Sequence, residues 1–359
     1  MKNVLVVDDS ALMRSVICDI INSDERFHVA DRAIDGENAL NLLVHKSYDA
    51  VILDVNMPKM TGLELLKELR DRNIVARVIM ASTDTKEGTK TTLDALSLGA
   101  IDFIHKPENA RDCKNGIFNK KLIGILETVC ECNAQTIYEQ EIDYSAEKEK
   151  TRKLAELASK SSKAVKERTI ICIASSTGGP KALQDVVPLF PSKIKAPIVI
   201  VQHMPEGFTA SLAERLDSLS DCKVTEAFDG EILKNGHVYI ARGGRHLNIR
   251  SSNNDFVFEY TDQPSREGVR PCANYMFESL SEGIADKVIC VVLTGMGADG
   301  TQGILNLRKD KKTYVITQSE ETCTVYGMPK SAVKAGISDC VLPLNSIAQE
   351  VIMNVGVDA

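Results

Sequence analysis

Short apolar runs recur along this chain, and each ends in a small or polar residue shortly before a stretch with helical spacing begins. In the first third of the sequence the runs occupy residues 4–7, 50–53, 78–81 and 101–104. Helical stretches such as 11–21, 62–72 and 87–98 lie between them. Apolar strands that alternate with helices predict a parallel sheet covered on both faces. The polar residues that end such strands converge on one edge of the sheet.

The same alternation restarts at residue 169, and a chain of 359 residues is too long for one ordinary core. We predict strands at 169–174, 197–202, 237–241, 288–293, 313–317 and 339–342. We predict helices near 180–189, 207–219, 272–285, 300–309 and 327–335. Two more strands around 246–260 indicate an antiparallel hairpin added to a mostly parallel sheet. The predicted fold class is therefore α/β, with two doubly wound parallel-sheet domains.

Charged residues dominate the segment between the two alternating regions. Residues 138–168 lack proline and glycine, and Leu154, Leu157 and Ala158 form only a thin apolar stripe. Such a composition is typical of a solvated, partly helical linker. We therefore assign residues 1–125 to a first domain, 126–168 to a charged linker and 169–359 to a second domain.

Five polar residues end the predicted strands of the first domain: Asp8, Asp9, Asp54, Ser82 and Lys106. Any one of them alone is most simply a solvated loop residue, but all five at strand ends favour a shared crevice. Three carboxylates brought together repel one another unless a hard cation lies among them, and their oxygens suit Mg²⁺. Asp54 could then attack a phosphoryl group whose oxygens Lys106 and Ser82 hold.

With these residues in place, the first domain resembles the flavodoxin-like receiver domain of response regulators. Residues 54–62 fit the motif that follows the phosphoacceptor of that family. The resemblance implies that Asp54 is phosphorylated by a partner histidine kinase. It also implies a metal site formed by Asp8, Asp9, Asp54 and the backbone carbonyl of Asn56, and a switch formed by Ser82, Phe103 and Lys106.

In the second domain, the apolar run 170–174 ends in two serines and a threonine, followed by Gly178, Gly179 and Pro180. This pattern predicts a buried strand and a turn into a helix whose first turn holds the proline. A serine at such a junction can present its hydroxyl beside the free N–H groups of the helix. We therefore predict that Ser176 is a nucleophile.

A serine nucleophile needs a base, and the second domain contains three histidines: His203, His237 and His246. Lone histidines are usually structural or surface residues. His203 follows the apolar run 196–201 and Gln202, which places it at the same sheet edge as Ser176. His237 lies in or just before a strand, and His246 follows the loop 242–245, which we interpret as the lining of a substrate groove. The strand-end position favours His203 as the base.

The loop after the buried run 288–293 is the candidate for the rest of the site. Residues 294–300 contain three glycines and end in Asp299 and Gly300. Glycines let backbone N–H groups converge, as an oxyanion site requires, and a buried Asp299 could orient the base. The competing interpretation makes Asp299 the N-cap of the helix near 300–309, and one residue could fill both roles.

The order Ser176, His203, Asp299 differs from the Ser-Asp-His order of α/β-hydrolases, and Ala174 replaces the first glycine of their nucleophile motif. The second domain instead resembles the Rossmann-like catalytic domain of chemotaxis-receptor glutamate methylesterases. The motifs that carry this resemblance are residues 176–180, 202–205, 294–300 and 326–329. The chain departs from the family pattern at Ala174, Gly244, Val269 and Asn274, which affects the expected contacts of the substrate groove.

The resemblance implies a Ser-His-Asp triad of Ser176, His203 and Asp299, with Thr177 and Met296 near the oxyanion. It implies hydrolysis of glutamate γ-methyl esters on chemotaxis receptors, deamidation of receptor glutamines, and activation by phosphorylation. No cofactor is expected for the esterase.

Composition bears on the alternatives. The alternative to an esterase is a response regulator whose second domain only binds DNA or an adaptor protein. A DNA-binding second domain would need a basic recognition helix. The second domain has eighteen Lys and Arg against twenty-two Asp and Glu, so nucleic acid is not expected as a partner. The ten cysteines are scattered and no apolar run approaches a membrane span, which favours a cytoplasmic protein without membrane insertion.

Overall fold

The computed structural model describes residues 1–82, 86–107, 116–132, 147–154 and 167–358. The chain folds into two compact units, Met1–Gln140 and Glu141–Ala359. The predicted linker begins within a helix, because α5 (Ile117–Glu131) continues past residue 125. Residues 147–154 are helical, and Gln349 of the second unit donates a hydrogen bond to Glu147 at 3.0 Å. The rest of the predicted linker, 133–146 and 155–166, lies outside the described residues.

The first unit is a five-stranded parallel sheet in the order β2-β1-β3-β4-β5. Its strands are β1 (Lys2–Val7), β2 (Phe27–Ala33), β3 (Ala50–Asp54), β4 (Val78–Ser82) and β5 (Asp102–His105). Its other helices are α1 (Ala11–Asn22), α2 (Gly36–His45), α3 (Gly62–Asp71) and α4 (Lys86–Ser97). The chain passes from β1 to β2 on one side and then to β3 on the other. Loops that leave these strands in opposite directions open a crevice at their carboxyl ends.

The second unit is a seven-stranded sheet in the order β14-β13-β12-β6-β7-β9-β8, with every pair parallel. Its strands are β6 (Thr169–Ser175), β7 (Ile198–Gln202), β8 (Lys223–Glu226), β9 (His237–Ile240), β12 (Lys287–Val292), β13 (Lys312–Gln318) and β14 (Cys340–Leu342). A separate antiparallel hairpin pairs β10 (His246–Ser252) with β11 (Asp255–Thr261). The predicted α/β fold with two parallel sheets and a hairpin is confirmed.

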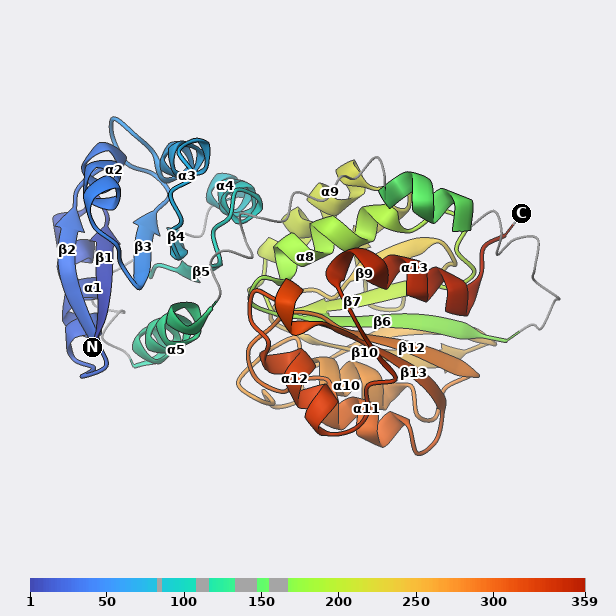
Figure 1. Cartoon of the computed structure of the whole chain (residues 1–359). Helices are drawn as coiled ribbons and strands as arrows, with labels where there is room; N and C mark the ends of the chain where they lie inside the picture. Colours follow the sequence, from blue (N-terminus) through green and yellow to red (C-terminus); the bar gives the residue numbers. More distant parts are fainter. Residues whose placement is uncertain (83–85, 108–115, 133–146, 155–166, 359) are drawn as a thin grey trace. The chain divides into compact units, whose positions relative to one another are not determined.

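Helices cover both faces of this sheet (Figure 1). One layer contains α8 (Gly179–Val186), α9 (Phe208–Leu219) and α13 (Leu344–Val355). The other contains α10 (Ala273–Ser279), α11 (Thr301–Leu307) and α12 (Gly327–Lys334). A strand buried on both faces must be apolar throughout, which explains why the runs at β6 and β12 lack the alternation of a half-exposed strand.

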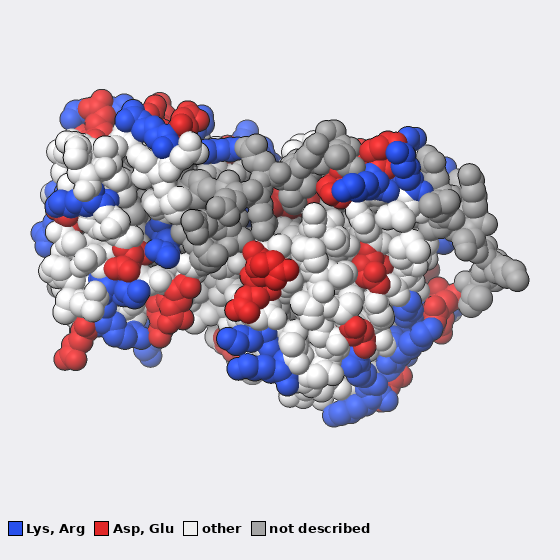
Figure 2. All heavy atoms as spheres, in the orientation of Figure 1, with Lys and Arg blue, Asp and Glu red and all other residues white. Residues whose placement is uncertain are grey.

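Acidic and basic side chains lie beside one another on the surface of the second unit. Arg308 pairs with Asp339 at 2.6 Å, Lys312 with Glu167 at 2.9 Å and Arg266 with Glu278 at 2.8 Å. Figure 2 shows red and blue groups next to one another over this unit. On the face shown, acidic groups lie among the basic ones over most of this unit, which does not favour a DNA-binding surface.

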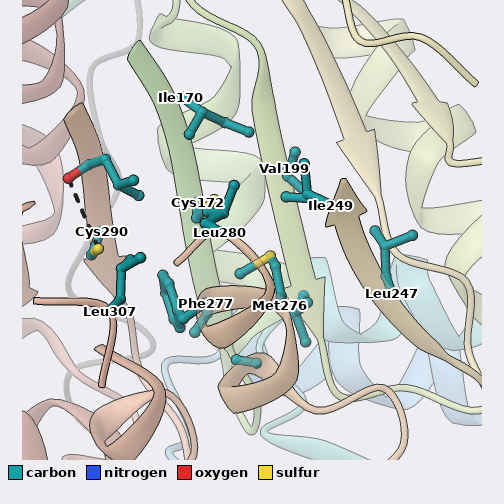
Figure 3. Close-up of a cluster of buried hydrophobic side chains, with 14 of the residues drawn as sticks. Ile170, Cys172, Val199, Leu247, Ile249, Met276, Phe277, Leu280, Cys290 and Leu307 are labelled. Carbon is teal, nitrogen blue, oxygen red and sulfur yellow. Dashed lines mark hydrogen bonds between the residues drawn. The ribbon is translucent and has the colours of Figure 1, made fainter. Parts of the chain in front are cut away.

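The core between the sheet and the α10–α11 layer follows from the two-residue period of the strands. Ile170, Cys172 and Ala174 of β6 point to one side and are completely buried there. Met276 and Phe277 of α10, with Leu280 just after it, pack against them, as Figure 3 shows. The hairpin contributes Leu247 and Ile249 to the same cluster, so it belongs to the core rather than standing free.

Some elements differ from the prediction. The helix expected over 272–285 ends at Ser279, because the N–H groups of Leu280, Ser281 and Gly283 bond carbonyls three residues back and tighten the chain into turns. Strands β2 and β8 were not predicted, because β2 alternates buried and exposed residues without a continuous apolar run and β8 is short with only Val224 buried. Helix α13 was not predicted either. No described helix is both long and apolar enough to cross a bilayer.

Candidate functional site

The strand order places the candidate site at the middle of the second sheet. From β6 the chain continues to β7 on one side, and it later returns to β12 on the other. The carboxyl ends of these three strands therefore surround the point where the order reverses, which is where doubly wound sheets bind their ligands. The N–H of His203 donates to the carbonyl of Ser175 at 3.1 Å, and that of Ser176 donates to Thr294 at 3.0 Å. Ser176 thus lies between the loops that follow β7 and β12.

Ser176 occupies the turn between β6 and α8. Its carbonyl accepts the N–H of Gly179 at 2.7 Å. Gly178 has a left-handed backbone with φ of 75°, and Pro180 lies in the first turn of α8, as the sequence predicts. Ser176 is half-buried, and its hydroxyl forms no hydrogen bond with any residue that the structure describes.

His203 and Asp299 are in direct contact, although 96 positions separate them in the chain. His203 Nε2 and Asp299 Oδ2 are 2.7 Å apart, and only 2% of the aspartate side chain is exposed. Since Nε2 bonds a carboxylate, it carries the proton, and Nδ1 is the ring nitrogen left to accept one. The arrangement brings the predicted base and its orienting acid together beside Ser176.

The Asp299 carboxylate also accepts hydrogen bonds from the start of α10. The N–H groups of Ala273 and Asn274 lie 2.6 and 2.9 Å from its oxygens, and Cys272 Sγ lies at 3.0 Å. Burial alone would raise the pKa of Asp299, but the bond and charge of His203, together with Cys272 and Ala273, hold it below its ordinary value.

The interpretation of Asp299 as the N-cap of the following helix is wrong, because Gly300 is the N-cap of α11 and Asp299 binds the start of α10 instead. The cap of α11 comes from Asn274. Its Oδ1 accepts the N–H groups of Gly300 at 3.1 Å and Gly303 at 2.6 Å. Asp299 therefore stabilises the start of α10, and Asn274 of α10 stabilises the start of α11. These bonds fix the aspartate relative to both helices.

The glycine-rich loop after β12 packs directly against the serine. A Cβ atom on Gly295 would lie 2.4 Å from Met328 Sδ and 2.7 Å from Ser176 Cβ. Thr294 Oγ1 donates to the carbonyl of Thr177 at 3.0 Å, which joins this loop to the serine turn. Met296 is 48% exposed at the apex of the loop. Both predicted oxyanion residues, Thr177 and Met296, thus belong to the two loops that meet at Ser176.

Gly295→Ala is expected to lower kcat on the order of 10²-fold, since the new methyl group must displace Ser176 or Met328 by a distance that disturbs the reacting geometry. The measurement is hydrolysis of the glutamate methyl ester that the resemblance implies as substrate, with circular dichroism to verify folding of the purified variant. Gly124→Ala is the control, because a Cβ there meets no atom within 4 Å. Wild-type kcat in folded Gly295→Ala protein would show that the loop can move away from the serine.

The other two histidines have structural environments. The ring of His237 stacks on Tyr239 at 4.1 Å and bonds Thr225 Oγ1 at 2.9 Å. His246 is completely buried against Tyr275, so its ring does not line a groove. The loop before it does lie beside the site, because a Cβ on Gly243 would lie 2.3 Å from the carbonyl oxygen of Pro205, two residues after His203.

The first unit contains a second polar cluster at the crevice between β1 and β3. Lys106 Nζ lies 3.1 Å from Asp8 Oδ2 and 2.7 Å from Asp54 Oδ1, and all three side chains are buried. Burial, reinforced by the charge of Asp8, raises the pKa of Asp54 despite the nearby lysine. Asp8, Asp9 and Asp54 each offer a carboxylate oxygen within 4.8 Å of the others. Asp8 and Asp54 are buried and Asp9 is exposed, and three carboxylates so close together fit a hard divalent cation.

The remaining residues predicted for the first unit surround this cluster. Ser82 is buried at the end of β4, and its carbonyl accepts the N–H of Lys106 at 2.7 Å. Phe103 is buried in β5 opposite Met80, and Asn56 is exposed in the loop after Asp54. Sequence reasoning missed Arg14, whose guanidinium donates to the carbonyl of Asp8 at 2.6 Å. Its place one turn into the helix after the acidic pair was the available signal.

Both units are similar to known protein families. A family model described as CheB methylesterase matches residues 171–351, and one described as response regulator receiver domain matches residues 4–117. A Syntrophomonas wolfei protein named "Protein-glutamate methylesterase/protein-glutamine glutaminase 1" is 40% identical over 355 residues, or 98% of each chain. A Bacillus subtilis protein named "Protein-glutamate methylesterase/protein-glutamine glutaminase" is 39% identical over 354 residues, also 98% of each chain.

A solved structure is similar to the second unit. The Thermotoga maritima CheB methylesterase catalytic domain is 44% identical and aligns with a TM-score of 0.51. The match covers 53% of this chain and the whole of that domain.

Proposed function

The chain belongs to the CheB methylesterase family, with a response-regulator receiver domain before the methylesterase domain, and on that premise we propose its substrates, catalytic residues and regulation. It is a carboxylic-ester hydrolase. We propose that it hydrolyses glutamate γ-methyl esters on chemotaxis receptors and also deamidates receptor glutamines. The observation that carries the proposal is the contact of His203 with Asp299 at the strand end next to Ser176.

In the proposed reaction, Ser176 Oγ attacks the γ-carbonyl carbon while His203 Nδ1 accepts the hydroxyl proton. Asp299 holds the imidazole through Nε2 and stabilises the positive charge that forms on it. The tetrahedral oxyanion forms between the serine turn and the loop 294–300, whose backbone N–H groups would stabilise it. His203 then returns the proton to the leaving methoxide, and methanol departs from the acyl-enzyme.

Water completes the cycle by the same steps. His203 removes a proton from water, hydroxide attacks the acyl carbon, and Ser176 leaves with the proton restored to it. A glutamine side chain can follow the same path with ammonia as the leaving group, since both substrates pass through similar tetrahedral intermediates. In both reactions the receptor side chain becomes a glutamate carboxylate.

We propose that the receiver regulates this activity through phosphorylation of Asp54 by the chemotaxis histidine kinase. Asp8, Asp9, Asp54 and the carbonyl of Asn56 would hold Mg²⁺, which supplies positive charge for the phosphoryl oxygens when bound. Lys106 already lies 2.7 Å from Asp54 and would hold one of those oxygens. To shift the equilibrium between the inactive and active states from 99:1 to 1:99, phosphorylation must favour the active state by about 5.5 kcal/mol.

Asp54→Asn is expected to abolish activation by a small phosphate donor while leaving the basal rate of methanol release unchanged, because the amide cannot form an acyl phosphate. The measurement is methanol release from methylated receptor membranes, with and without acetyl phosphate and Mg²⁺. Asp71→Asn is the matched control, since Asp71 is an exposed aspartate at the end of α3. Activation that survives in Asp54→Asn protein would move the phosphorylation site elsewhere.

A response regulator with a non-catalytic output domain is the other candidate function. The mixed surface charge of the second unit does not favour a DNA-binding output (Figure 2). Ser176→Ala separates the two candidates, because only an esterase would release methanol before the serine hydroxyl is removed and lose that activity afterwards.

A further inference from the structure

Gln202 is the last residue of β7. It is buried where the pairing of β6 with β7 ends, just before Ser176 and His203, the proposed nucleophile and base. Its side chain is 1% exposed and bonds three neighbours. Nε2 donates to the carbonyl of Ser176 at 3.0 Å and to the carbonyl of His203 at 3.2 Å. Oε1 accepts the hydroxyl of Ser175 at 2.7 Å. One planar amide therefore contacts the backbone of both residues.

The orientation of this amide is determined by its partners. Two carbonyl oxygens can only accept hydrogen bonds, so the nitrogen must face them and the oxygen must face the Ser175 hydroxyl. The regular ladder between β6 and β7 ends with the bond from His203 N–H to the Ser175 carbonyl. Beyond that point, the glutamine amide provides the cross-strand connection that the backbone no longer supplies.

The helix after the serine is also built around this side chain. A Cβ atom on Gly179 would lie 2.1 Å from Gln202 Oε1 and 2.9 Å from Ser175 Cβ. Gly179 is therefore required by the close approach of the amide rather than by a left-handed backbone. The first turn of α8, the serine turn and the histidine loop all pack on the same group.

We propose that Gln202 is a positioning residue that sets the distance and angle between Ser176 and His203. It acts through their backbone carbonyls and does not touch substrate, because it is buried beneath them. The inference rests on the proposed function, in which Ser176 is the nucleophile and His203 is the base. Proton transfer between these two groups is sensitive to displacements of about 1 Å, which can cost about 10²-fold in rate.

Gln202→Glu tests this in the full-length protein with little change in volume. A carboxyl group has at most one proton to donate, whereas the amide NH₂ donates to two carbonyls, so at least one of the two strand ends loses its hydrogen bond. We expect kcat for methanol release, measured with acetyl phosphate and Mg²⁺ present, to fall about 10²-fold with KM unchanged. Gln184→Glu is the matched control and should keep wild-type kcat. Gln184 is another buried glutamine of this unit, but its amide bonds Pro180 and Arg215 instead.

A merely structural role would lower the amount of folded protein, not kcat per folded molecule, so circular dichroism and thermal unfolding accompany the kinetics. Folded Gln202→Glu protein with wild-type kcat would overturn the proposal. If that variant does not fold, Ser175→Ala decides, because it removes only the hydroxyl that orients the amide. A several-fold loss of kcat with unchanged KM supports the proposal, and wild-type kcat overturns it.

Ser176→Ala, assayed alongside, separates this inference from the proposed function. Activity that persists in Ser176→Ala protein would remove the serine mechanism, whatever the Gln202 variants do. An inactive Ser176→Ala protein together with fully active Gln202→Glu protein would overturn only the positioning role.

Discussion

Ser176→Ala is expected to eliminate methanol release from methylated receptor membranes, with a loss of at least about 10⁴-fold in kcat. The variant removes the atom that forms the acyl-enzyme, and His203 and Asp299 then have no nucleophile to activate. The remaining loop N–H groups stabilise an oxyanion only if water attacks directly, which is far slower. Because Ser176 is half-buried and its hydroxyl bonds no described residue, the substitution leaves no group without its partner.

The assay compares Ser176→Ala with wild type at saturating acetyl phosphate and Mg²⁺, so that regulation does not limit either protein. Ser218→Ala is the matched control, since Ser218 is an exposed serine on α9 whose hydroxyl donates to the carbonyl of Arg215. It should hydrolyse the ester at the wild-type rate. Residual activity of more than a few per cent in Ser176→Ala protein would require a different nucleophile.

Asp299→Asn is expected to lower kcat on the order of 10⁴-fold, as loss of the orienting carboxylate does in serine proteases. The structure adds a reason that is specific to this site. Each carboxylate oxygen accepts at least two hydrogen bonds, from His203 and Ala273 on one side and from Cys272, Asn274 and Gly300 on the other. An amide must turn its NH₂ group toward one of these donor sets. Either the imidazole loses its correct tautomer or the start of α10 loses its cap.

The same variant should therefore also be less stable. A buried donor that loses its acceptor costs about 1–3 kcal/mol, so the free energy of unfolding should fall by at least that amount. Chemical denaturation measures this loss, while kcat is normalised to folded protein.

Asp286→Asn is the matched control, because Asp286 accepts the backbone N–H of Arg168 at 2.8 Å far from the site. The amide oxygen of Asn can still accept this N–H and the side chain is exposed, so stability and kcat should both stay close to the wild-type values. If Asp299→Asn protein is destabilised but its kcat per folded molecule changes only a few-fold, the aspartate serves α10 alone.

Much of the fold follows from local sequence patterns. The apolar runs at β1, β3, β4, β6, β7 and β12 are continuous because both faces of a parallel strand are buried, and this period is visible without any knowledge of the fold. The elements that were missed have weaker local signals. Strand β8 is a short edge strand, and the helix expected over 272–285 stops where bonds to carbonyls three residues back replace helical ones.

Local sequence is enough to locate the residues at the carboxyl ends of strands, because strand-end position depends on nearby residues. Ser176, His203, Asp8 and Asp54 were all identified in this way. Chain order also excluded an ordinary α/β-hydrolase. Which of these residues meet remained open, since that depends on strand order and register. Asp8 and Lys106, for example, are separated by 98 positions in the chain.

The hydrogen-bond partners of Asp299 and Gln202 depend on the packing of distant segments. From the sequence, Asp299 was an equally good cap for the helix that follows it, yet its carboxylate binds α10, whose first residues lie 25 and 26 positions earlier. Gln202 was part of a motif without a role until the register set its amide between Ser176 and His203. Both outcomes have the same physical cause. A buried polar group must find donors or acceptors, and the nearest ones are provided by the packing of distant segments rather than by its neighbours in the chain.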